Sequence, residues 1–327
     1  MFDAANERTR PNLKVQDGCD NRCSFCVIPY VRGQSRSLKM DAVIREVETL
    51  VSAGYREVVI SGINLGRWGR DFAVSSQPSA VSYQLSAISK IRQRPRANDQ
   101  RPAFEDLVRA ILSETALEKL RISSVEPMDW TDELIQLVAT SPRIAKHAHV
   151  PLQSGSDAVL RRMHRKYRPW HYREKIEKIH AAMPTAAIGA DVMVGFPGET
   201  DAEFDETRRL IEDLPFTYLH VFTYSARPGT PAAALSGQVP VHIARERNRV
   251  LRGIGASKKL AFMKSFVSSS MEVITLNVAG CDEEGEYTEG LTDNYLPVRV
   301  KGKYPPNRWI PVRIENVRQE ALLGFAA

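Results

Sequence analysis

Short apolar runs and amphipathic stretches alternate along most of the chain. The apolar runs are rich in β-branched residues and stand at 13–16, 57–61, 120–125, 147–150, 188–194 and 218–223. Stretches with apolar residues on one helical face stand at 41–53, 131–140, 170–183 and 201–213. A repeated strand followed by a helix is typical of a parallel sheet. Six strands predict an α/β fold with a partial, open (β/α)6 barrel of the TIM type, in preference to a closed eightfold barrel.

The pattern changes after residue 240. One long basic helix is expected at 241–266, and short runs split by turns follow at 271–278, 286–289, 295–300, 309–314 and 321–324. Five strands in so short a stretch predict a small all-β barrel. We therefore expect a lead-in at 1–12, a core domain at 13–240, a linking helix at 241–266 and a small barrel at 267–327. A Ser-, Gln- and Arg-rich segment at 72–102 interrupts the core pattern, and we expect an exposed, disordered insertion there.

Composition bounds the class of protein. The 327 residues carry 45 Lys and Arg against 39 Asp and Glu, a formal net charge of +6. This mildly basic balance permits a nucleic-acid partner without requiring one. The first residues show no apolar leader, and no run of about twenty apolar residues occurs, so we expect a cytoplasmic protein without a membrane partner.

Three of the four cysteines lie within eight positions. Cys19, Cys23 and Cys26 have the spacing C-x3-C-x2-C, and the nearest histidine in sequence is His147. Thiolates suit zinc or iron–sulfur centres, but a structural zinc ion takes four protein ligands. Three cysteines favour a four-iron cluster with one open iron. The alternatives are a zinc site completed from afar or reduced cysteines that only pack. A disulfide framework is disfavoured by the odd number and by the low cysteine content.

Polar residues and glycines gather where the predicted strands end. Parallel strands place their carboxyl ends at one edge of the fold, where cofactors bind, so these residues predict one pocket. The alternative is that the glycines and prolines only make turns. His147 and His149 share one face of a strand by period two, and they either line this pocket or pack as structural histidines.

The predicted small barrel carries basic and aromatic residues together. They are Arg299, Lys301, Lys303, Arg308, Arg313 and Arg318, with Tyr295, Tyr304 and Trp309 between them. Such a combination is typical of RNA-binding barrels, although a solvated basic face with ordinary strand aromatics has the same composition. Cys281, alone in this region, is expected to be an inert small residue.

Several motifs together resemble one known family, the radical S-adenosylmethionine (SAM) methylthiotransferases. These enzymes add a methylthio group to tRNA or to a ribosomal protein. The resemblance runs from about residue 9 to the C-terminus, outside 72–102. It rests on 14–19, the cysteine motif with Phe25 before its last cysteine, 28–33, 121–124, 149–156, 163–167, 191–200 and 224–230. The C-terminal barrel resembles the family's RNA-binding TRAM domain.

The resemblance implies cofactors and their ligands. Cys19, Cys23 and Cys26 would hold one [4Fe–4S] cluster, with SAM on its open iron. Reductive cleavage of SAM would give a 5′-deoxyadenosyl radical that removes hydrogen from C2 of the target adenine. Phe25 would pack near the SAM adenine and Gly62 would admit its methionine end. The expected partners of its amine and ribose hydroxyls are Ser124, Glu126, Gln153 and Asp191.

The resemblance also implies a substrate. Residues 152–156 and 220–225 are most similar to the branch that acts on N6-threonylcarbamoyladenosine at position 37 of tRNA, with an unidentified electron donor. The alternatives are a ribosomal-protein methylthiotransferase and an RNA-binding remnant without complete sulfur transfer. The family carries a second [4Fe–4S] cluster on an N-terminal domain. Its three cysteines are absent from this sequence, so we expect no second cluster on this chain.

Overall fold

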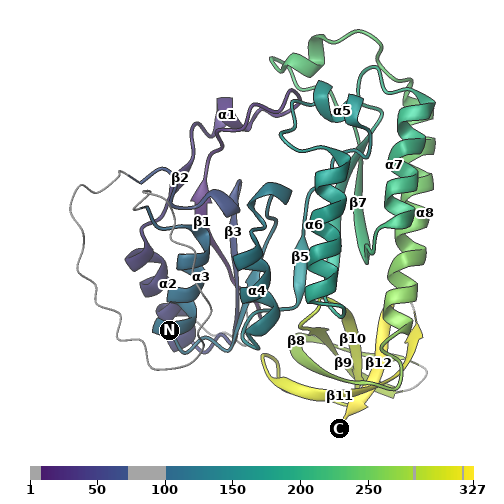
Figure 1. Ribbon diagram of the computed structural model, residues 1–327. Coiled ribbons are helices and arrows are strands. Elements are labelled where there is room, and N and C mark those ends of the chain that lie inside the picture. The colour runs from purple at the N-terminus through teal and green to yellow at the C-terminus, as the bar shows by residue number, and fades with distance from the viewer. Residues whose placement is uncertain (1–8, 73–100, 283–284, 319) are drawn as a thin grey trace.

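A parallel sheet, its covering helices and a small closed barrel are seen in the computed structural model, which describes residues 9–72, 101–282, 285–318 and 320–327 (Figure 1). The insertion expected at 72–102 falls almost wholly on 73–100, outside the described residues. Among the residues that are described, no helix has the length and apolar character to cross a membrane.

The six predicted parallel strands are all present. They are β1 (Asn12–Asp17), β3 (Glu57–Gly62), β4 (Lys119–Ile122), β5 (His147–His149), β6 (Ala187–Val194) and β7 (Tyr218–Thr223). They form two sheets, β2-β1-β3-β4 and β5-β6-β7, in which the two-residue β2 (Arg36–Ser37) is an antiparallel edge strand. Isolated parallel bridges from Leu120 to Ile144 and from Ser124 to His149 join the two sheets. The α/β prediction is therefore confirmed.

Helices cover one face of this sheet. They are α2 (Met40–Ser52), α3 (Phe104–Glu114), α4 (Asp132–Thr140), α5 (Asp157–Arg162), α6 (Pro169–Ala182) and α7 (Asp201–Asp213), with the short α1 (Ile28–Val31) in the loop after β1. Alternate residues of β6, such as Ile188, Ala190 and Val192, are fully buried in one core with Ile176 of α6 and Ile211 of α7. Because side chains alternate along a strand, Gly189, Asp191 and Met193 point to the opposite face.

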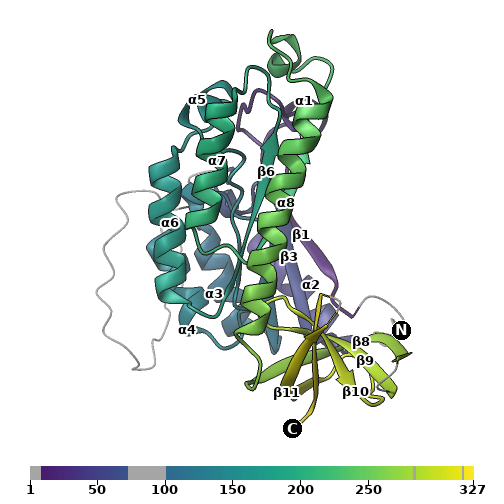
Figure 2. The same ribbon diagram turned by 90° about the vertical axis from the view of Figure 1, so that its right-hand side faces the viewer.

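The long helix α8 (Val241–Lys264) packs along β7. It leads to the small barrel (Figure 2). Gly255 lets it approach Leu219, since a Cβ there would lie 3.3 Å from the Leu219 Cβ. Arg247 of this helix is buried, and its Nη1 lies 2.7 Å from Oε2 of the buried Glu199. One of the basic residues of this helix thus makes an internal ion pair instead of meeting solvent.

Five strands close the predicted small barrel. They are β8 (Ser270–Asp282), β9 (Gly285–Thr292), β10 (Pro297–Lys301), β11 (Trp309–Arg318) and β12 (Ala321–Ala326), in the spatial order β10-β12-β11-β8-β9. All neighbouring pairs are antiparallel except β10 with β12. The fold therefore contains the second, all-β unit that the sequence predicted.

The small barrel docks on the amino-terminal ends of the parallel strands. Asn307 donates from Nδ2 to the Gly54 carbonyl before β3, at 2.7 Å. Arg121 of β4 donates to the carbonyl of Asp293 at 3.1 Å, and Asn294 donates to that of Thr185 at 2.9 Å. The barrel consequently lies at the opposite end of the sheet from the loop that follows β1 (Figure 1).

Candidate active site

The predicted cysteines lie on a loop of residues 18–33, which we call the cysteine loop. It begins at Gly18, whose φ is +69° and where a Cβ would meet the Gln34 carbonyl oxygen at 2.0 Å. Only glycine fits such a position without strain. A hydrogen bond of 3.1 Å from the Cys19 backbone N–H to the Gly33 carbonyl closes the base of the loop. Gly18 therefore determines where β1 ends and the cysteine loop begins.

Contacts with distant segments hold the middle of the cysteine loop. Ser24 is buried, and its amide and hydroxyl donate to the carbonyls of Met163 (3.1 Å) and Arg162 (2.7 Å). Its own carbonyl accepts from the Ala232 amide at 2.8 Å. Phe25 packs edge-on against Phe196 with ring centroids 6.5 Å apart. The loop after β1 thereby spans the carboxyl ends of the strands.

The three thiols lie on one short loop and are each partly buried. Burial raises the pKa of Cys19 and of Cys26, and the neighbouring Cys23 sulfur raises both further. Thiolates are ligands that zinc and iron–sulfur centres share, so the loop offers three ligands to a soft metal centre.

A buried arginine joins the cysteine loop to one predicted residue. Arg165 donates from Nη1 to the Cys23 Sγ at 3.1 Å and from Nη2 to Oε2 of Glu126. Its side chain is only 5% exposed. The fully buried Tyr167 fixes it further, because Arg165 Nε lies 3.3 Å from the Tyr167 hydroxyl oxygen. Glu126 therefore faces the cysteines through a positively charged bridge.

Two amide side chains beside Cys19 leave polar atoms without partners. The Asn21 backbone nitrogen and the Asn64 side-chain Nδ2 lie 3.4 and 3.7 Å from the Cys19 Sγ. The Oδ1 atoms of both residues are buried without a hydrogen-bond partner. Buried polar atoms are almost always satisfied in native proteins, so these oxygens indicate room for a bound polar group next to the loop.

The Gln16 side chain occupies the space next to Gly62. A Cβ at this position would lie 2.9 Å from both the Cβ and the Oε1 of Gln16. The same Gln16 Oε1 accepts a hydrogen bond from the Asn64 backbone N–H at 2.8 Å. The absence of a side chain at Gly62 therefore admits Gln16, which positions Asn64.

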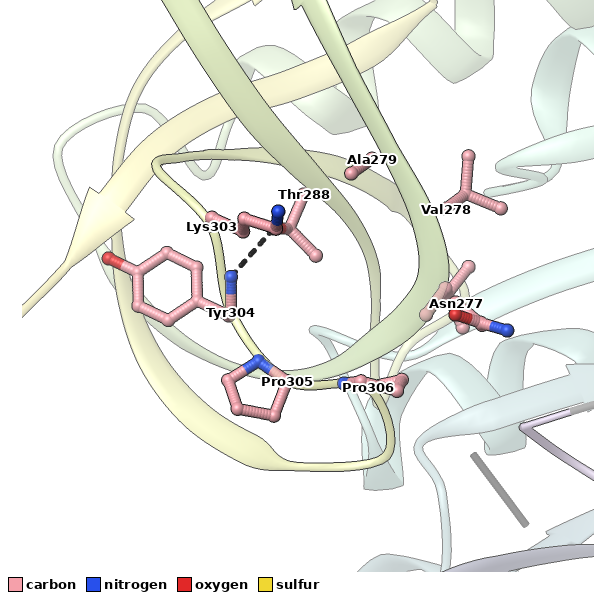
Figure 3. A pocket seen from close by; sticks show the side chains of 9 residues that line it. Asn277, Val278, Ala279, Thr288, Lys303, Tyr304, Pro305 and Pro306 are labelled. Carbon is pink, nitrogen blue, oxygen red and sulfur yellow. Dashed lines mark hydrogen bonds between the residues drawn. The ribbon is translucent and has the colours of Figure 1, made fainter. Parts of the chain in front are cut away.

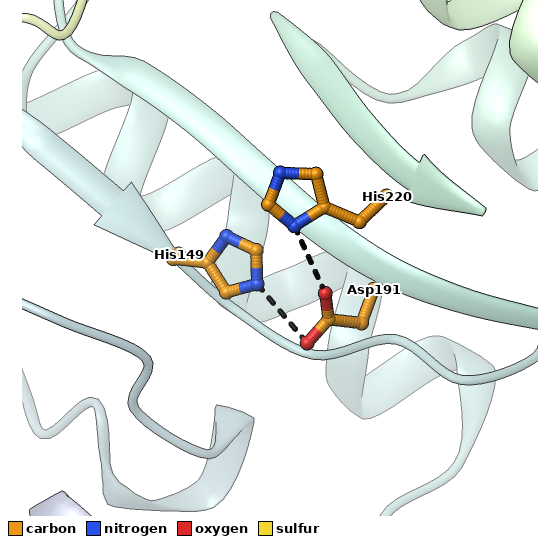
Figure 4. A group of neighbouring side chains, drawn as sticks. All are labelled: His149, Asp191 and His220. Atoms are coloured by element: carbon orange, nitrogen blue, oxygen red, sulfur yellow. Dashed lines mark hydrogen bonds and ion pairs between the residues drawn. The ribbon is translucent and has the colours of Figure 1, made fainter. Parts of the chain in front are cut away.

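A second polar group lies on the face of β5, β6 and β7 that the helices leave uncovered. Its members, the histidine–aspartate trio, are His149, Asp191 and His220 (Figure 4). His149 Nε2 is 3.1 Å from Asp191 Oδ2, and His220 Nδ1 is 3.3 Å from Asp191 Oδ1. Burial opposes ionisation of Asp191, but hydrogen bonds from the two histidines outweigh it and lower its pKa. Asp191 is therefore a charged acceptor between two imidazole donors.

Tyr218 supports the trio from the amino-terminal side. Its hydroxyl lies 2.9 Å from His149 Nδ1 and 2.7 Å from His147 Nε2. Since Asp191 accepts from Nε2 of His149, a neutral His149 accepts the Tyr218 hydroxyl proton at Nδ1. Gly189 is required here, because a Cβ would meet the Tyr218 ring at 1.9 Å.

The predicted cofactor residues thus fall into two groups. Phe25, Gly62 and Glu126 belong to the surroundings of the cysteine loop. Asp191 belongs to the trio, and two others lie beside it. Ser124 forms an isolated β-bridge with His149. Gln153, whose φ is +64°, donates a hydrogen bond from its backbone N–H to the Asp191 backbone carbonyl at 2.8 Å.

Three residues of these groups are not singled out by the sequence. Arg165 lies in a motif that indicates only the family resemblance, and Asn64 lies among the polar residues of a strand end, which predict a pocket but no individual role. His220 lies opposite Asp191 in the β6–β7 register, and only the strand pairing reveals this. For His149 the sequence leaves a pocket role and a packing role open, and the structure places it in the trio.

The small barrel uses two of its three noted aromatics for docking. The Tyr295 ring lies 4.9 Å from that of His147, and the Lys119 Nζ lies 5.2 Å from the Trp309 ring. The third, Tyr304, lines a cavity of about 410 Å³ together with Asn277, Val278, Ala279, Thr288, Lys303, Pro305 and Pro306 (Figure 3). Cys281 is exposed on β8. Tyr295 nevertheless keeps 41% of its surface exposed, so it contacts both the core domain and solvent.

Comparison with known proteins identifies the core. The family model of the radical SAM superfamily matches residues 13–211. The chain is similar to the threonylcarbamoyladenosine tRNA methylthiotransferase of Bacillus subtilis, with 37% identity over 91% of the chain and 60% of that protein. A Chlamydia pneumoniae protein of the same name is 34% identical over 97% of the chain and 68% of its own length. The tRNA-2-methylthio-N(6)-dimethylallyladenosine synthase of Nocardia farcinica is 37% identical over 96% of the chain and 60% of its length.

Solved structures show the same fold at low identity. Coproporphyrinogen III oxidase from Escherichia coli, a radical SAM enzyme, superposes with a TM-score of 0.50 at 12% identity, over 98% of this chain and 72% of that one. The radical SAM methyltransferase TsrM from Kitasatospora setae also reaches 0.50, at 15% identity, over 68% and 38%. The chain spans about 60% of the length of the first relatives that it matches.

Proposed function

Because the chain belongs to the radical SAM superfamily, and within it to the methylthiotransferases, we propose that it acts in the methylthiolation of adenosine 37 in tRNA. The observation that carries this proposal is the cysteine loop. Its three thiols, Cys19, Cys23 and Cys26, lie on a loop across the carboxyl ends of a parallel sheet and are partly buried. Parallel α/β folds place their cofactor chemistry at that edge.

The residues present fit a [4Fe–4S] cluster and SAM. When bound, these cofactors supply a reductively generated 5′-deoxyadenosyl radical that removes hydrogen from the target carbon. The protein orients them and excludes water. The three cysteines would hold the cluster, and Arg165 would donate a hydrogen bond to the Cys23 sulfur. The unpaired buried oxygens of Asn21 and Asn64 would accept hydrogen bonds from the SAM amine or hydroxyls. Phe25 packs on Phe196 and would hold the cysteine loop in place.

A tRNA substrate is supported by the relatives. The compared methylthiotransferases are named for tRNA, some for N6-threonylcarbamoyladenosine and others for dimethylallyladenosine. We propose the threonylcarbamoyl branch, on the similarity of residues 152–156 and 220–225 to it. The small barrel would serve as a TRAM domain that contacts the anticodon arm through basic residues such as Lys303. No residue of this chain is assigned to sulfur donation.

The radical half of this function can be tested directly. After anaerobic reconstitution with iron and sulfide, we expect about four irons per chain and the formation of 5′-deoxyadenosine from SAM in the presence of dithionite. The Cys23→Ala variant should lose both, whereas the matched Cys281→Ala variant, which changes an exposed cysteine of the small barrel, should keep both. Bound zinc in place of iron, or no cleavage of SAM, would refute the proposal.

A further inference from the structure

The uncovered face of β5, β6 and β7 combines polar and aromatic side chains. We call this the lumen face, made of His149, Asp191, Met193, His220 and Phe222. It is opposite to the face that packs on α6 and α7, because Ile188, Ala190 and Val192 alternate with its members and are fully buried there. Phe222 is 54% exposed, as is the side chain of His220. Aromatic side chains combined with a few placed polar groups are typical of ligand-binding sites.

The polar part of the lumen face is held in place from several sides. The trio lies on three adjacent strands, and Asp191 stands directly opposite His220 in the strand pairing. His149 is fixed by the Tyr218 hydroxyl. Groups on rigid strands with supporting hydrogen bonds are oriented well enough to select a ligand by its donors and acceptors.

The aromatic part adjoins the polar part. The ring centroids of His220 and Phe222 are 6.5 Å apart and their planes are inclined by 69°. His220 therefore stands between an exposed phenyl ring and the Asp191 carboxylate. A flat heteroaromatic ring that packs on Phe222 would place a polar substituent next to the trio. Purine bases stack on aromatic side chains in this way in RNA-binding proteins.

We infer that His149, Asp191 and His220 form a subsite for a hydrogen-bonding substituent on the target purine, with Phe222 as the surface on which the base packs. This inference rests on the proposed function. It assigns to the trio the selection between a threonylcarbamoyl and a dimethylallyl substrate. A threonylcarbamoyl group offers the N–H groups of a urea and a hydroxyl as hydrogen-bond donors, which the charged Asp191 carboxylate can accept. A dimethylallyl group offers none, and its apolar carbons would displace water from a charged carboxylate and two imidazoles without replacing the hydrogen bonds. Sites built for hydrogen bonds reject analogues that lack them far more strongly than apolar sites reject polar ones.

The test is equilibrium binding of anticodon stem-loop RNAs to the whole chain, measured by fluorescence anisotropy. Three RNAs differ only at adenosine 37, which carries a threonylcarbamoyl group, a dimethylallyl group or no substituent. We expect the unaltered chain to prefer the first. His220→Phe should reduce that preference by about tenfold, the effect of one lost hydrogen bond to a charged group. His220→Asn should restore part of it, because its amide can donate to Asp191 from the position of Nδ1.

The control variant is His180→Phe, which makes the same substitution at an exposed position near the end of α6. It should leave the preference unchanged. A preference that survives in His220→Phe would overturn the inference while leaving the proposed function intact. Equal, weak binding of all three RNAs by the unaltered chain would count against the proposed tRNA function itself.

Two imidazoles and a carboxylate are also a ligand set for transition metals, and this makes a second arm of the test. We expect no stoichiometric cobalt(II) complex in a chain whose Cys19, Cys23 and Cys26 are replaced by alanine. A cobalt(II) spectrum without thiolate charge transfer that disappears in His220→Phe would reassign the trio as a metal site and overturn the inference.

Discussion

Arg165 offers the sharpest test of the chemistry proposed for the cysteine loop. Its guanidinium lies 3.1 Å from the Cys23 sulfur, is nearly inaccessible to solvent and is held by Glu126 and Tyr167. Hydrogen bonds and positive charge at a cluster sulfur stabilise the reduced state, because reduction adds negative charge that the donor can offset. Arg165→Met should therefore lower the midpoint potential of the reconstituted cluster.

The magnitude follows from that single contact. A hydrogen bond to a charged group contributes about 1.5–3 kcal/mol. If about half of this energy differs between the two redox states, the loss is about 1 kcal/mol. One-electron couples shift by 59 mV for each tenfold change in equilibrium, or for about 1.4 kcal/mol. The expected decrease for Arg165→Met is therefore about 40 mV.

An anaerobic redox titration followed by electron paramagnetic resonance would measure this shift. Glu126→Gln supplies a control of opposite sign, because it removes a negative charge that pairs with the same arginine and should raise the potential. Arg165→Lys keeps the charge but not the planar, fixed set of donors, and it should restore only part of the shift. An unchanged or higher potential in Arg165→Met, with full iron content, would refute the reasoning.

Three further predictions concern the cysteine loop and the stability of the fold. Gly18→Ala should reduce iron retention after reconstitution, because its positive φ alone costs about 1–3 kcal/mol and its Cβ would overlap a carbonyl oxygen. Arg247→Met should lower the free energy of unfolding in urea by about 3–5 kcal/mol, because it leaves the buried Glu199 carboxylate without its charged partner. The exposed Arg249→Met on the same helix should change it by about 0.5 kcal/mol or less. Although partial burial raises the pKa of Glu203, the hydrogen bond from Arg162 lowers it overall. Its contribution is therefore present above its ordinary pKa and lost as pH falls through and below about 4.5, and Glu203→Gln should flatten that part of the pH profile of unfolding.

Local patterns in the sequence were sufficient to predict the strands and most helices. Predicted strands such as 57–61 and 188–194 are runs of mostly apolar residues, and the helices 131–140 and 201–213 match α4 and α7 closely. The helix α3 was missed although Phe104, Leu107, Val108 and Ile111 have helical spacing, because it follows directly on the irregular segment 72–102. The edge strand β2 has two residues and no periodicity that a sequence could reveal.

The candidate site was predictable only where it is local. The spacing of the cysteines lies within one loop, so the sequence displays it. The contact between Arg165 and Cys23 joins positions 142 residues apart, and no periodicity links them. Gly62 shows a further limit: the sequence marks a glycine at a strand end, but only packing shows that a Cβ there would lie 2.9 Å from the Gln16 side chain, and its place beside SAM stays a prediction. Which neighbour a small residue admits depends on tertiary packing and not on the residue itself.

The position of the small barrel constrains how an RNA could use both parts of the molecule. The barrel is fixed to the amino-terminal ends of the strands by Asn307, Asn294 and Arg121, whereas the cysteine loop spans their carboxyl ends. Tyr295 further joins the two parts by packing on His147, and its ring centroid lies 6.0 Å from that of Tyr218. An RNA whose target base enters the lumen face can reach the barrel only by running along the length of the sheet. The barrel would then hold a stem at a distance from the reacting base, so substitutions at Lys303 should weaken the binding of all three stem-loops equally, while substitutions at His220 should change which one is preferred.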